Sequence, residues 1–491
     1  MSQPVVHIKN LDLKYSNKVV LKDLNWTIRR GENWILNGHS GSGKTTLAKI
    51  IAGKHKAIGA VNINFDNSSP LPSLVLYVES WYQFKNIEGV ANFYYQQRYT
   101  SWQAKETLTV SEELKLFGKE HRLDYAQAES IMDVLNFSQQ ANAQLIELSS
   151  GEHKKFQLVK ALWLKPQVLI LDQPYTGLDV KSRKNLNILL NDISNKGVTL
   201  ILIGNGEELP TCINRFAMLS EGNIKEVSHA DLLQLKEDIT IGSLPGYLKE
   251  PPGYSSDAIV KMVDINISYG DKKVLKNIHW EVKKGEKWLL QGPNGSGKST
   301  LLSLINGDHP QAYANELYLF GNKRGSGESI WDIKERIGLI SPEFHWYFDG
   351  SSTVWQCVAS GLYDNFGLEL HLPFSKAKKV DELIEYFGIT AIKNETLATL
   401  PLGKQRLVLL ARTIIKNPEL LILDEPCQGL DPEQTKYFNL LVDELCSNGM
   451  TLIYVGHYES EIPNTLEKKI ILENGEVKAI KAVKTTELVL E

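Results

Sequence analysis

The sequence predicts an α/β protein in which one kind of domain, built on a mostly parallel sheet, occurs twice. Three observations support this fold class. Apolar runs of strand length alternate with helical patterns, which favours parallel strands covered by helices. The chain repeats itself at about half of its 491 residues. Each half also contains a short strand, a glycine-rich loop and a helical pattern in immediate succession.

The repeat keeps the order and spacing of its matching residues. Lys44 corresponds to Lys298, 254 residues later. A period this long makes each unit a whole domain and excludes a solenoid. In each half one segment, 80–147 or 344–399, is richer in helical patterning, and we predict that it is an inserted helical subdomain.

Proline and glycine mark the boundary between the halves. The stretch GSLPGYLKEPPGYSSD at 242–257 contains three prolines and three glycines, which break regular elements. We therefore predict a first domain over 1–240, a linker over 241–257 and a second domain over 258–491.

Composition excludes several classes of function. The 54 Lys and Arg against 58 Asp and Glu give a net charge of −4, which does not favour a nucleic-acid partner. The four cysteines show no CxxC spacing, which argues against a disulfide framework, a zinc site and an iron–sulfur cluster. No apolar run is long enough to span a bilayer, and the first residues lack a signal-peptide profile. We expect a cytoplasmic protein, with peripheral association at the inner face of the cell membrane as an alternative.

Two glycine-rich loops predict phosphate binding. GHSGSGKT at 38–45 and GPNGSGKS at 292–299 both fit GxxxxGK[ST], after a strand and before a helix. In that context the glycines let backbone N–H groups converge on phosphates at a helix N-terminus, and the lysine reaches the outer phosphates. One such match could be a plain glycine-rich turn, but two in the right context exclude that reading. The predicted phosphate-binding residues are Gly38, Gly41, Gly43, Lys44, Thr45 and Thr46 in the first loop, and Gly292, Asn294, Gly295, Gly297, Lys298, Ser299 and Thr300 in the second.

Two buried strands end in an acidic residue. VLILD at 168–172 and LLILD at 420–424 are continuous apolar runs, as expected for central parallel strands. Alone, either aspartate could belong to an ordinary turn. Beside a phosphate loop, the carboxylate of such an aspartate can hold a water molecule that is bound to Mg²⁺. The hydroxyl group of the residue after the loop lysine binds the Mg²⁺ ion itself. The predicted magnesium ligands are Thr45, Asp172, Ser299 and Asp424.

With LSSGE at 148–152 and two GLD turns ending in Asp179 and Asp431, the chain resembles an ATP-binding-cassette (ABC) ATPase with two cassettes in tandem. The resemblance covers essentially the whole chain. It implies two P-loop NTPase domains, each with a mostly parallel core sheet, an antiparallel β-subdomain and an inserted helical subdomain. It also implies that the cassettes pair head to tail, each ATP lying between the phosphate loop of one and the LSGGQ-type signature of the other.

The resemblance adds further ATP-binding residues. Tyr15 and Tyr269 match the aromatic residue that stacks on adenine, and both lie 29 residues before a loop lysine. The remaining matches to ATP-binding positions are Ser149, Gly151, Glu152, Asp179 and Asp431.

The two halves differ at the hydrolytic positions. In the family, the Glu directly after the strand Asp polarises the water, and a His after the next strand positions it. Glu425 and His457 match these positions in the second half, so we predict that they are catalytic. The first half has Gln173 and Asn205, which accept no proton at neutral pH, and losing a general base commonly costs about 10²- to 10⁴-fold in rate.

The signatures differ in the opposite sense. LPLGK at 400–404 has Pro401 in place of the serine and ends in Lys404, whereas the first half keeps Ser149 and Gly151. Head-to-tail pairing then collects every defect in one composite site. The degenerate site joins Lys44, Asp172, Gln173 and Asn205 to Pro401 and Lys404. The other site is complete, so we predict one hydrolytic site and one that binds ATP but turns it over slowly.

The glutamine that usually couples ATP to a partner protein is not evident in either half. Glu79 stands near its place in the first half, with Gln83 a few residues on, and Pro342 or Glu343 stands there in the second. Which residue replaces it stays open.

The stretch at 306–341 resembles the ModF-type tandem ATPases, a bacterial family associated with molybdate uptake. It implies an ATPase subunit that drives a membrane permease, with the helical segments as docking surface. A soluble mechanoenzyme acting on ribosomes or nucleic acid, or a regulatory ATP sensor, are the alternatives. The aromatic stretch at 94–107 could stack on nucleobases, but packing or docking suits a helical subdomain better. Both cassettes lie on one chain, so we expect a monomer.

Overall fold

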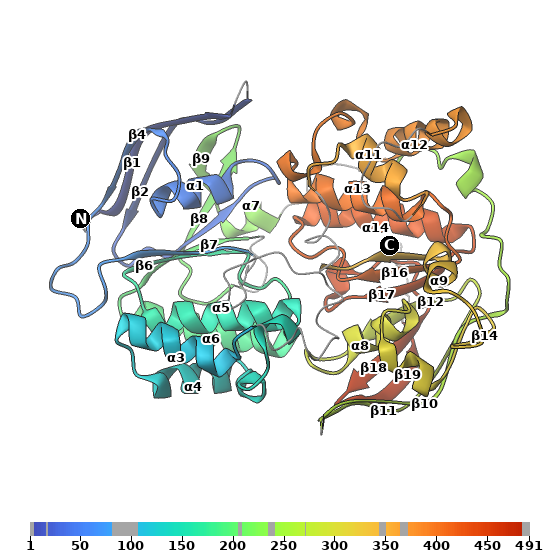
Figure 1. The fold of residues 1–491 in the computed structure, drawn as a ribbon. Helices are drawn as coiled ribbons and strands as arrows, with labels where there is room; N and C mark the ends of the chain where they lie inside the picture. The colour runs from blue at the N-terminus through green and yellow to red at the C-terminus, as the bar shows by residue number, and fades with distance from the viewer. Residues whose placement is uncertain are drawn as a thin grey trace, which may run out of the picture. The chain divides into compact units, whose positions relative to one another are not determined.

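The computed structural model describes residues 4–15, 18–80, 107–204, 209–233, 241–270, 272–342, 350–363 and 372–483. These residues form two compact units, one made of the described residues between 4 and 233 and the other of those between 241 and 483 (Figure 1). Each unit has its own sheets and cores.

The first unit is built on a six-stranded sheet in the order β5-β6-β7-β3-β8-β9. All neighbours are parallel except β8 and β9. Every residue of β3, β6 and β7 is buried, as expected for strands covered on both faces. The strands are β3 (Trp34–Asn37), β5 (Val75–Val78), β6 (Val168–Asp172), β7 (Thr199–Ile203), β8 (Arg215–Ser220) and β9 (Asn223–Glu226).

An antiparallel sheet covers one face of this parallel sheet. Its order is β2-β1-β4, formed by β1 (Pro4–Tyr15), β2 (Lys18–Arg29) and β4 (Ile58–Ile63). Helix α1 (Lys44–Ile51) shares one apolar core with both sheets, to which Leu21, Leu47 and Ile170 contribute.

Helices cover the other face (Figure 1). They share a second core, to which Leu114, Phe156 and Leu186 contribute from three different helices. The helices of this layer are α3 (Val110–His121), α4 (Tyr125–Val134), α5 (Ser150–Leu164), α6 (Val180–Asn195) and α7 (His229–Leu233), with 3₁₀ turns at Ser138–Gln140 and Leu145–Glu147.

The second unit repeats this architecture. Its main sheet has the order β15-β16-β17-β12-β18-β19, parallel except for the last pair, and its antiparallel sheet has the order β11-β10-β13-β14. The strands are β10 (Ala258–Tyr269), β11 (Lys272–Lys283), β12 (Lys287–Gln291), β13 (Glu316–Leu319), β14 (Asn322–Lys323), β15 (Ile337–Ile340), β16 (Leu420–Asp424), β17 (Thr451–Val455), β18 (Lys468–Glu473) and β19 (Glu476–Ala482). The predicted fold class, two α/β domains with parallel core sheets and antiparallel β-subdomains, is confirmed.

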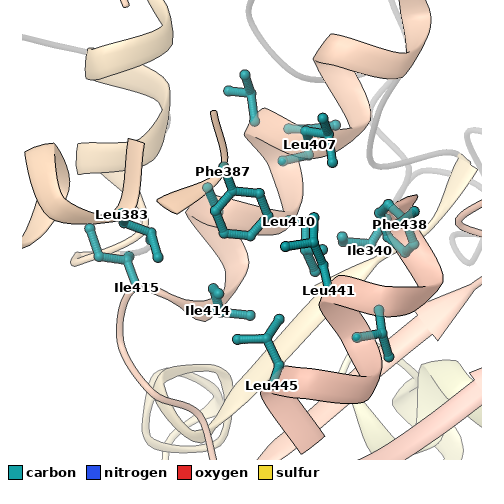
Figure 2. Close-up of a cluster of buried hydrophobic side chains, with 14 of the residues drawn as sticks. Ile340, Leu383, Phe387, Leu407, Leu410, Ile414, Ile415, Phe438, Leu441 and Leu445 are labelled. Atoms are coloured by element: carbon teal, nitrogen blue, oxygen red, sulfur yellow. The ribbon is translucent and has the colours of Figure 1, made fainter. Parts of the chain in front are cut away.

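One large apolar core joins the helices between 354 and 447 to the parallel sheet of the second unit, and another joins the helices at 298–305 and 330–336 to both of its sheets. Figure 2 shows Leu383, Leu410, Leu441 and Ile340 from four elements converging on the first of these cores, together with Phe387. The helices are α8 (Lys298–Ile305), α9 (Ile330–Arg336), α11 (Val354–Ser360), α12 (Phe374–Tyr386), α13 (Leu402–Ile414) and α14 (Pro432–Ser447). The 3₁₀ turns are Gly246–Leu248, Pro310–Ala314, Thr390–Ile392, Leu397–Thr399 and Glu459–Glu461.

The segment 241–257, expected to be a linker without regular structure, packs on the second unit. It contains a 3₁₀ turn at Gly246–Leu248, and Leu244 and Leu248 are buried in the core of that unit. Apolar side chains on both sides of Pro245 explain this packing. Within the described residues, no helix is both long enough and apolar enough to cross a membrane.

Candidate functional site

Both glycine-rich loops connect a central strand to a helix, as expected. β3 leads into α1 and β12 leads into α8. The first glycines of the loops, Gly38 and Gly292, have φ of 149° and 156°. A Cβ atom on either would lie 2.3 Å from the backbone oxygen of Leu219 or Leu472. The close approach of two backbones therefore requires glycine at the loop entrance.

The loops end at the N-termini of two helices that lack a side-chain cap. Gly43 and Gly297 cap α1 and α8 with left-handed φ values of 103° and 101°, and neither helix has a side-chain cap. The first N–H groups of such helices lack intrahelical partners and bind anions well. The remaining predicted phosphate-binding residues lie in the two loops or in the first turn of α1 or α8: Gly41, Thr46, Asn294, Gly295, Ser299 and Thr300.

The loop lysines fold back over their own loops. The Nζ atom of Lys44 donates to the backbone oxygens of Gly38 and His39, the latter at 2.9 Å. Lys298 Nζ donates to the Gly292 oxygen at 2.8 Å. Each ammonium group therefore already lies over the space that the glycines leave open, where phosphate oxygens can become its partners.

The predicted magnesium ligands of the first unit meet. Thr45 Oγ1 donates to Asp172 Oδ2 at 2.7 Å, across the gap between α1 and the end of β6. Hydroxyl and carboxylate oxygens are the hard ligands that Mg²⁺ prefers, so this donor set fits the ion. In the second unit Ser299 lies in the first turn of α8 and Asp424 ends β16. Asp172 is buried, whereas Asp424 is half-buried.

The predicted catalytic residues of the second unit are in direct contact. His457 Nε2 lies 3.0 Å from Glu425 Oε1, and Gln428 Nε2 donates to Glu425 Oε2 at 3.0 Å. Glu425 directly follows β16 with φ of 45°, and its backbone N–H donates to the Val455 oxygen at 3.0 Å. The side chains of His457 and Glu425 are 9% and 16% exposed, so the pair is sheltered without being sealed from solvent.

The first unit keeps this backbone but not its chemistry. Gln173 has the same φ of 45°, and its N–H donates to the Ile203 oxygen at 2.8 Å. Its side-chain oxygen accepts a long hydrogen bond of 3.5 Å from Thr176. An amide takes up no proton at neutral pH. Asn205 lies outside the described residues, so its place beside Gln173 stays a prediction.

The signature of the first unit forms the start of α5. Ser149 is the N-cap and forms a capping box with Glu152, whose Oε1 accepts from Gln140 at 2.6 Å. Gly151 is buried in the first turn. In the second unit Pro401 occupies the N-cap of α13 and provides no side-chain cap. Lys404, at the position of Glu152, is exposed.

The aspartates of the GLD turns cap helices. Asp179 accepts from Ser182 N at the start of α6, and Asp431 from Gln434 N at the start of α14, both at 2.8 Å. This explains an aspartate at each position without a nucleotide. A contact of either with ATP stays a prediction.

The tyrosines predicted to stack on adenine end equivalent strands, β1 and β10. The Tyr269 ring is 41% exposed, and its hydroxyl lies 2.8 Å from Nε2 of the buried His309. The side chain of Tyr15 lies outside the described residues.

The family model of ABC transporter ATP-binding proteins matches residues 21–176 and 275–428. The chain belongs to the ABC transporter family of ATP-binding proteins. It is 32% identical to the ABC transporter ATP-binding protein ModF of Escherichia coli over 90% of this chain and 92% of that protein. It is 30% identical to an uncharacterized ABC transporter ATP-binding protein of Schizosaccharomyces pombe over 93% of this chain and 96% of that one. A solved nucleotide-free cassette from an ABC transporter is 22% identical, with a TM-score of 0.40, over 46% of this chain and 92% of that one.

This ABC protein therefore binds ATP, and it is an ATPase that converts ATP and water to ADP and phosphate. The resemblance to tandem cassettes of the ModF type is confirmed. The two units are its first and second cassettes.

Two residues beside Asp172 were missed by the sequence analysis. The hydroxyl of Tyr77 on β5 donates to Asp172 Oδ2 at 3.0 Å, and Lys154 Nζ on α5 donates to the Asp172 backbone oxygen at 3.1 Å. Tyr77 stands in an apolar strand and Lys154 in a helix with many charges, so neither has a motif of its own.

The coupling position remains without a glutamine among the described residues. Glu79 directly follows β5, and its carboxylate lies 3.7 Å from Lys49 Nζ and 4.0 Å from Lys54 Nζ. Pro342 directly follows Ser341 after β15, and both Gln83 and Glu343 lie outside the described residues.

Proposed function

We propose that this ABC ATPase hydrolyses ATP at one site, formed around Glu425 of the second cassette, and holds ATP with slow turnover at the first cassette. The contact between Glu425 and His457 carries this proposal. At the same backbone position, with the same φ of 45°, the first cassette places an amide. Because the two sites share this backbone conformation and differ in the side chain, we expect them to differ more in the rate of hydrolysis than in the affinity for nucleotide.

Glu425 is the general base in this proposal. Its carboxylate accepts the proton of a water that attacks the γ-phosphate, while the Nε2–H of His457 donates to Oε1 and fixes the carboxylate's orientation. Lys298 and the N-terminus of α8 hold the phosphates. A Mg²⁺ ion held by Ser299 and Asp424 would neutralise charge on the phosphates when bound. Most of the rate then comes from positioning and electrostatics.

The head-to-tail pairing predicted from the sequence completes this proposal. It assigns Ser149 and the N-terminus of α5 to the ATP of the second cassette. α5 is a helix of 15 residues whose start offers a hydroxyl and N–H groups, a combination suited to phosphate. The start of α13 offers Pro401, which has neither group. We therefore propose that the signature around Ser149 and the general base Glu425 act on the same ATP.

The proposed biological role is to energise a membrane permease. Closure of the cassettes on ATP and reopening after hydrolysis would drive the permease. The name of the Escherichia coli relative, ABC transporter ATP-binding protein ModF, supports a transport role, and a molybdate-type solute is the corresponding substrate class. Copurification with membrane proteins supports this role, whereas copurification with ribosomes or DNA refutes it.

Steady-state hydrolysis in the presence of magnesium tests the single-site proposal. We expect Glu425→Gln to reduce turnover by about 10²- to 10⁴-fold, the usual cost of a lost general base. Gln173→Glu restores a carboxylate in the first cassette, and we expect it to change turnover little because Asn205 and Pro401 remain. Substantial turnover without Glu425 would contradict the proposal.

A further inference from the structure

The carboxylate of Asp172 has a second donor besides Thr45. In the parallel pairing of β5 with β6, Tyr77 lies opposite Ile170. Ile170 comes two residues before Asp172 on β6. Side chains two residues apart on a strand share a face, so the phenol points along the same face as the carboxylate. The Tyr77 ring is only 4% exposed, and its hydroxyl reaches Asp172 Oδ2 at 3.0 Å. One carboxylate oxygen thus accepts from two hydroxyl groups on two different elements.

The backbone at Asp172 is fixed from a third element. Lys154 Nζ donates to the backbone oxygens of Asp172 at 3.1 Å, Glu79 at 3.0 Å and Ser80 at 3.3 Å. These carbonyl groups match the three N–H donors of an ammonium group. Lys154 is 3% exposed, so water competes little for these bonds. The ends of β5 and β6 are therefore tied to α5, and Asp172 has little freedom in backbone or side chain.

The second cassette keeps the buried cation but loses the phenol. Arg406 follows Lys154 by 252 residues and is fully buried. Leu339 lies opposite Ile422, two residues before Asp424, in the register position of Tyr77. A leucine cannot donate a hydrogen bond. One difference between the cassettes at their strand aspartates is therefore Tyr77 against Leu339.

We propose that Tyr77 is a positioning residue of the first cassette, which fixes the Asp172 carboxylate before a magnesium nucleotide binds and thereby slows the release of that nucleotide. This inference rests on the proposed function, in which the first cassette holds ATP. A ligand group that is already oriented loses less conformational freedom on binding. Hydrogen bonds to charged acceptors are among the strong ones, so the phenol holds the carboxylate firmly.

The test measures release of a fluorescent ATP analogue, mant-ATP, from the full chain. The parent variant is Lys298→Ala, which disables the phosphate loop of the second cassette and leaves binding to the first. We expect Tyr77→Phe in this parent to release magnesium mant-ATP about tenfold faster. A change of this size corresponds to part of the free energy of one hydrogen bond to a charged group. Without magnesium, in excess EDTA, the two release rates should agree, a dependence that a merely structural role of Tyr77 would not produce.

Tyr386→Phe is the matched control. The Tyr386 hydroxyl also donates to a carboxylate, Glu444 Oε2 at 2.9 Å, and its ring is 5% exposed on α12 of the second cassette. Both substitutions keep the ring and remove one phenol, so the thermal midpoints of the nucleotide-free proteins should fall by similar amounts. Only Tyr77→Phe should change release.

The outcomes separate this inference from the proposed function. An unchanged release rate in Tyr77→Phe, or equal acceleration in Tyr386→Phe, overturns the role of Tyr77 and leaves the slow first site standing. If the Lys298→Ala parent holds no mant-ATP at all, the proposal that the first cassette retains ATP is wrong, and the inference falls with it.

Discussion

Ser149→Ala separates the structural role of the signature serine from its proposed role in hydrolysis. In the structure Ser149 Oγ accepts from Glu152 N at 3.4 Å, and Glu152 Oε2 accepts from Ser149 N at 2.8 Å. Removing such a cap costs about 1 kcal/mol. The hydroxyl itself donates to Glu152 Oε2 at 2.7 Å. If it donates instead to a phosphate in the hydrolytic site when ATP is bound, the variant loses a hydrogen bond to a charged group worth about 1.5–3 kcal/mol. Applied to the transition state, that loss slows hydrolysis about 10- to 150-fold.

Thr109→Ala provides the control in the same cassette. Thr109 caps α3 with an equivalent capping box, in which Glu112 N donates to Oγ1 at 3.2 Å and Thr109 N donates to Glu112 Oε2 at 2.8 Å. Urea unfolding should show that both variants lose about 1 kcal/mol of stability in the first cassette. Steady-state ATPase assays should show a large loss for Ser149→Ala alone. Equal turnover in the two variants would refute the assignment of Ser149 to the hydrolytic site.

Three further predictions concern the second cassette. Gly292→Ala should abolish hydrolysis in a phosphate-release assay, because a Cβ atom at this position would lie 2.3 Å from the Leu472 backbone oxygen. Gly246→Ala is the control and should hydrolyse ATP normally, because a Cβ atom at Gly246 would meet open space. Leu441→Ala should destabilise the second cassette by about 2–5 kcal/mol in urea unfolding, since Leu441 is fully buried in the core of Figure 2; a loss below about 1 kcal/mol would contradict this packing. Burial raises the pKa of the Cys446 thiol from its usual value near 9 to about 12. The unfolded protein therefore loses this proton at a lower pH than the folded protein does, and the free energy of unfolding falls as the pH rises from 9 toward 12. Between pH 8 and pH 10 the wild type should therefore lose about 1.4 kcal/mol more than Cys446→Ala, and equal losses in urea unfolding would refute this.

The contiguous motifs made much of the fold and site predictable. The carboxyl ends of parallel strands meet at one edge of a sheet. A loop after β3 and an acid at the end of β6 are therefore expected to meet, as Thr45 and Asp172 do. The pairing of Glu425 with His457 was predictable for the same reason, since each follows one of two neighbouring strands, β16 and β17.

Other features depend on registers and packing that no local pattern encodes. Tyr77 reaches Asp172 because β5 pairs with β6 in one particular register, and a shift by one residue would turn the phenol to the other face. Lys154 reaches three backbone oxygens only because α5 docks over the ends of β5 and β6. The proline-rich segment at 241–257 showed its turn signals plainly, but its packing is decided by Leu244 and Leu248, which are buried in the second cassette.

The stoichiometry of nucleotide left on the protein after one round of hydrolysis tests the single hydrolytic site most directly. The protein is mixed with magnesium and two molar equivalents of radioactive ATP, so that both cassettes can fill. The mixture is quenched in acid before nucleotide release, and ADP and ATP are separated by chromatography. With one hydrolytic site, the wild type should retain one ADP and one intact ATP per chain, and Glu425→Gln should retain two ATP per chain. Two ADP per chain in the wild type would contradict a single hydrolytic site, because the first cassette would then hydrolyse ATP without a carboxylate at Gln173.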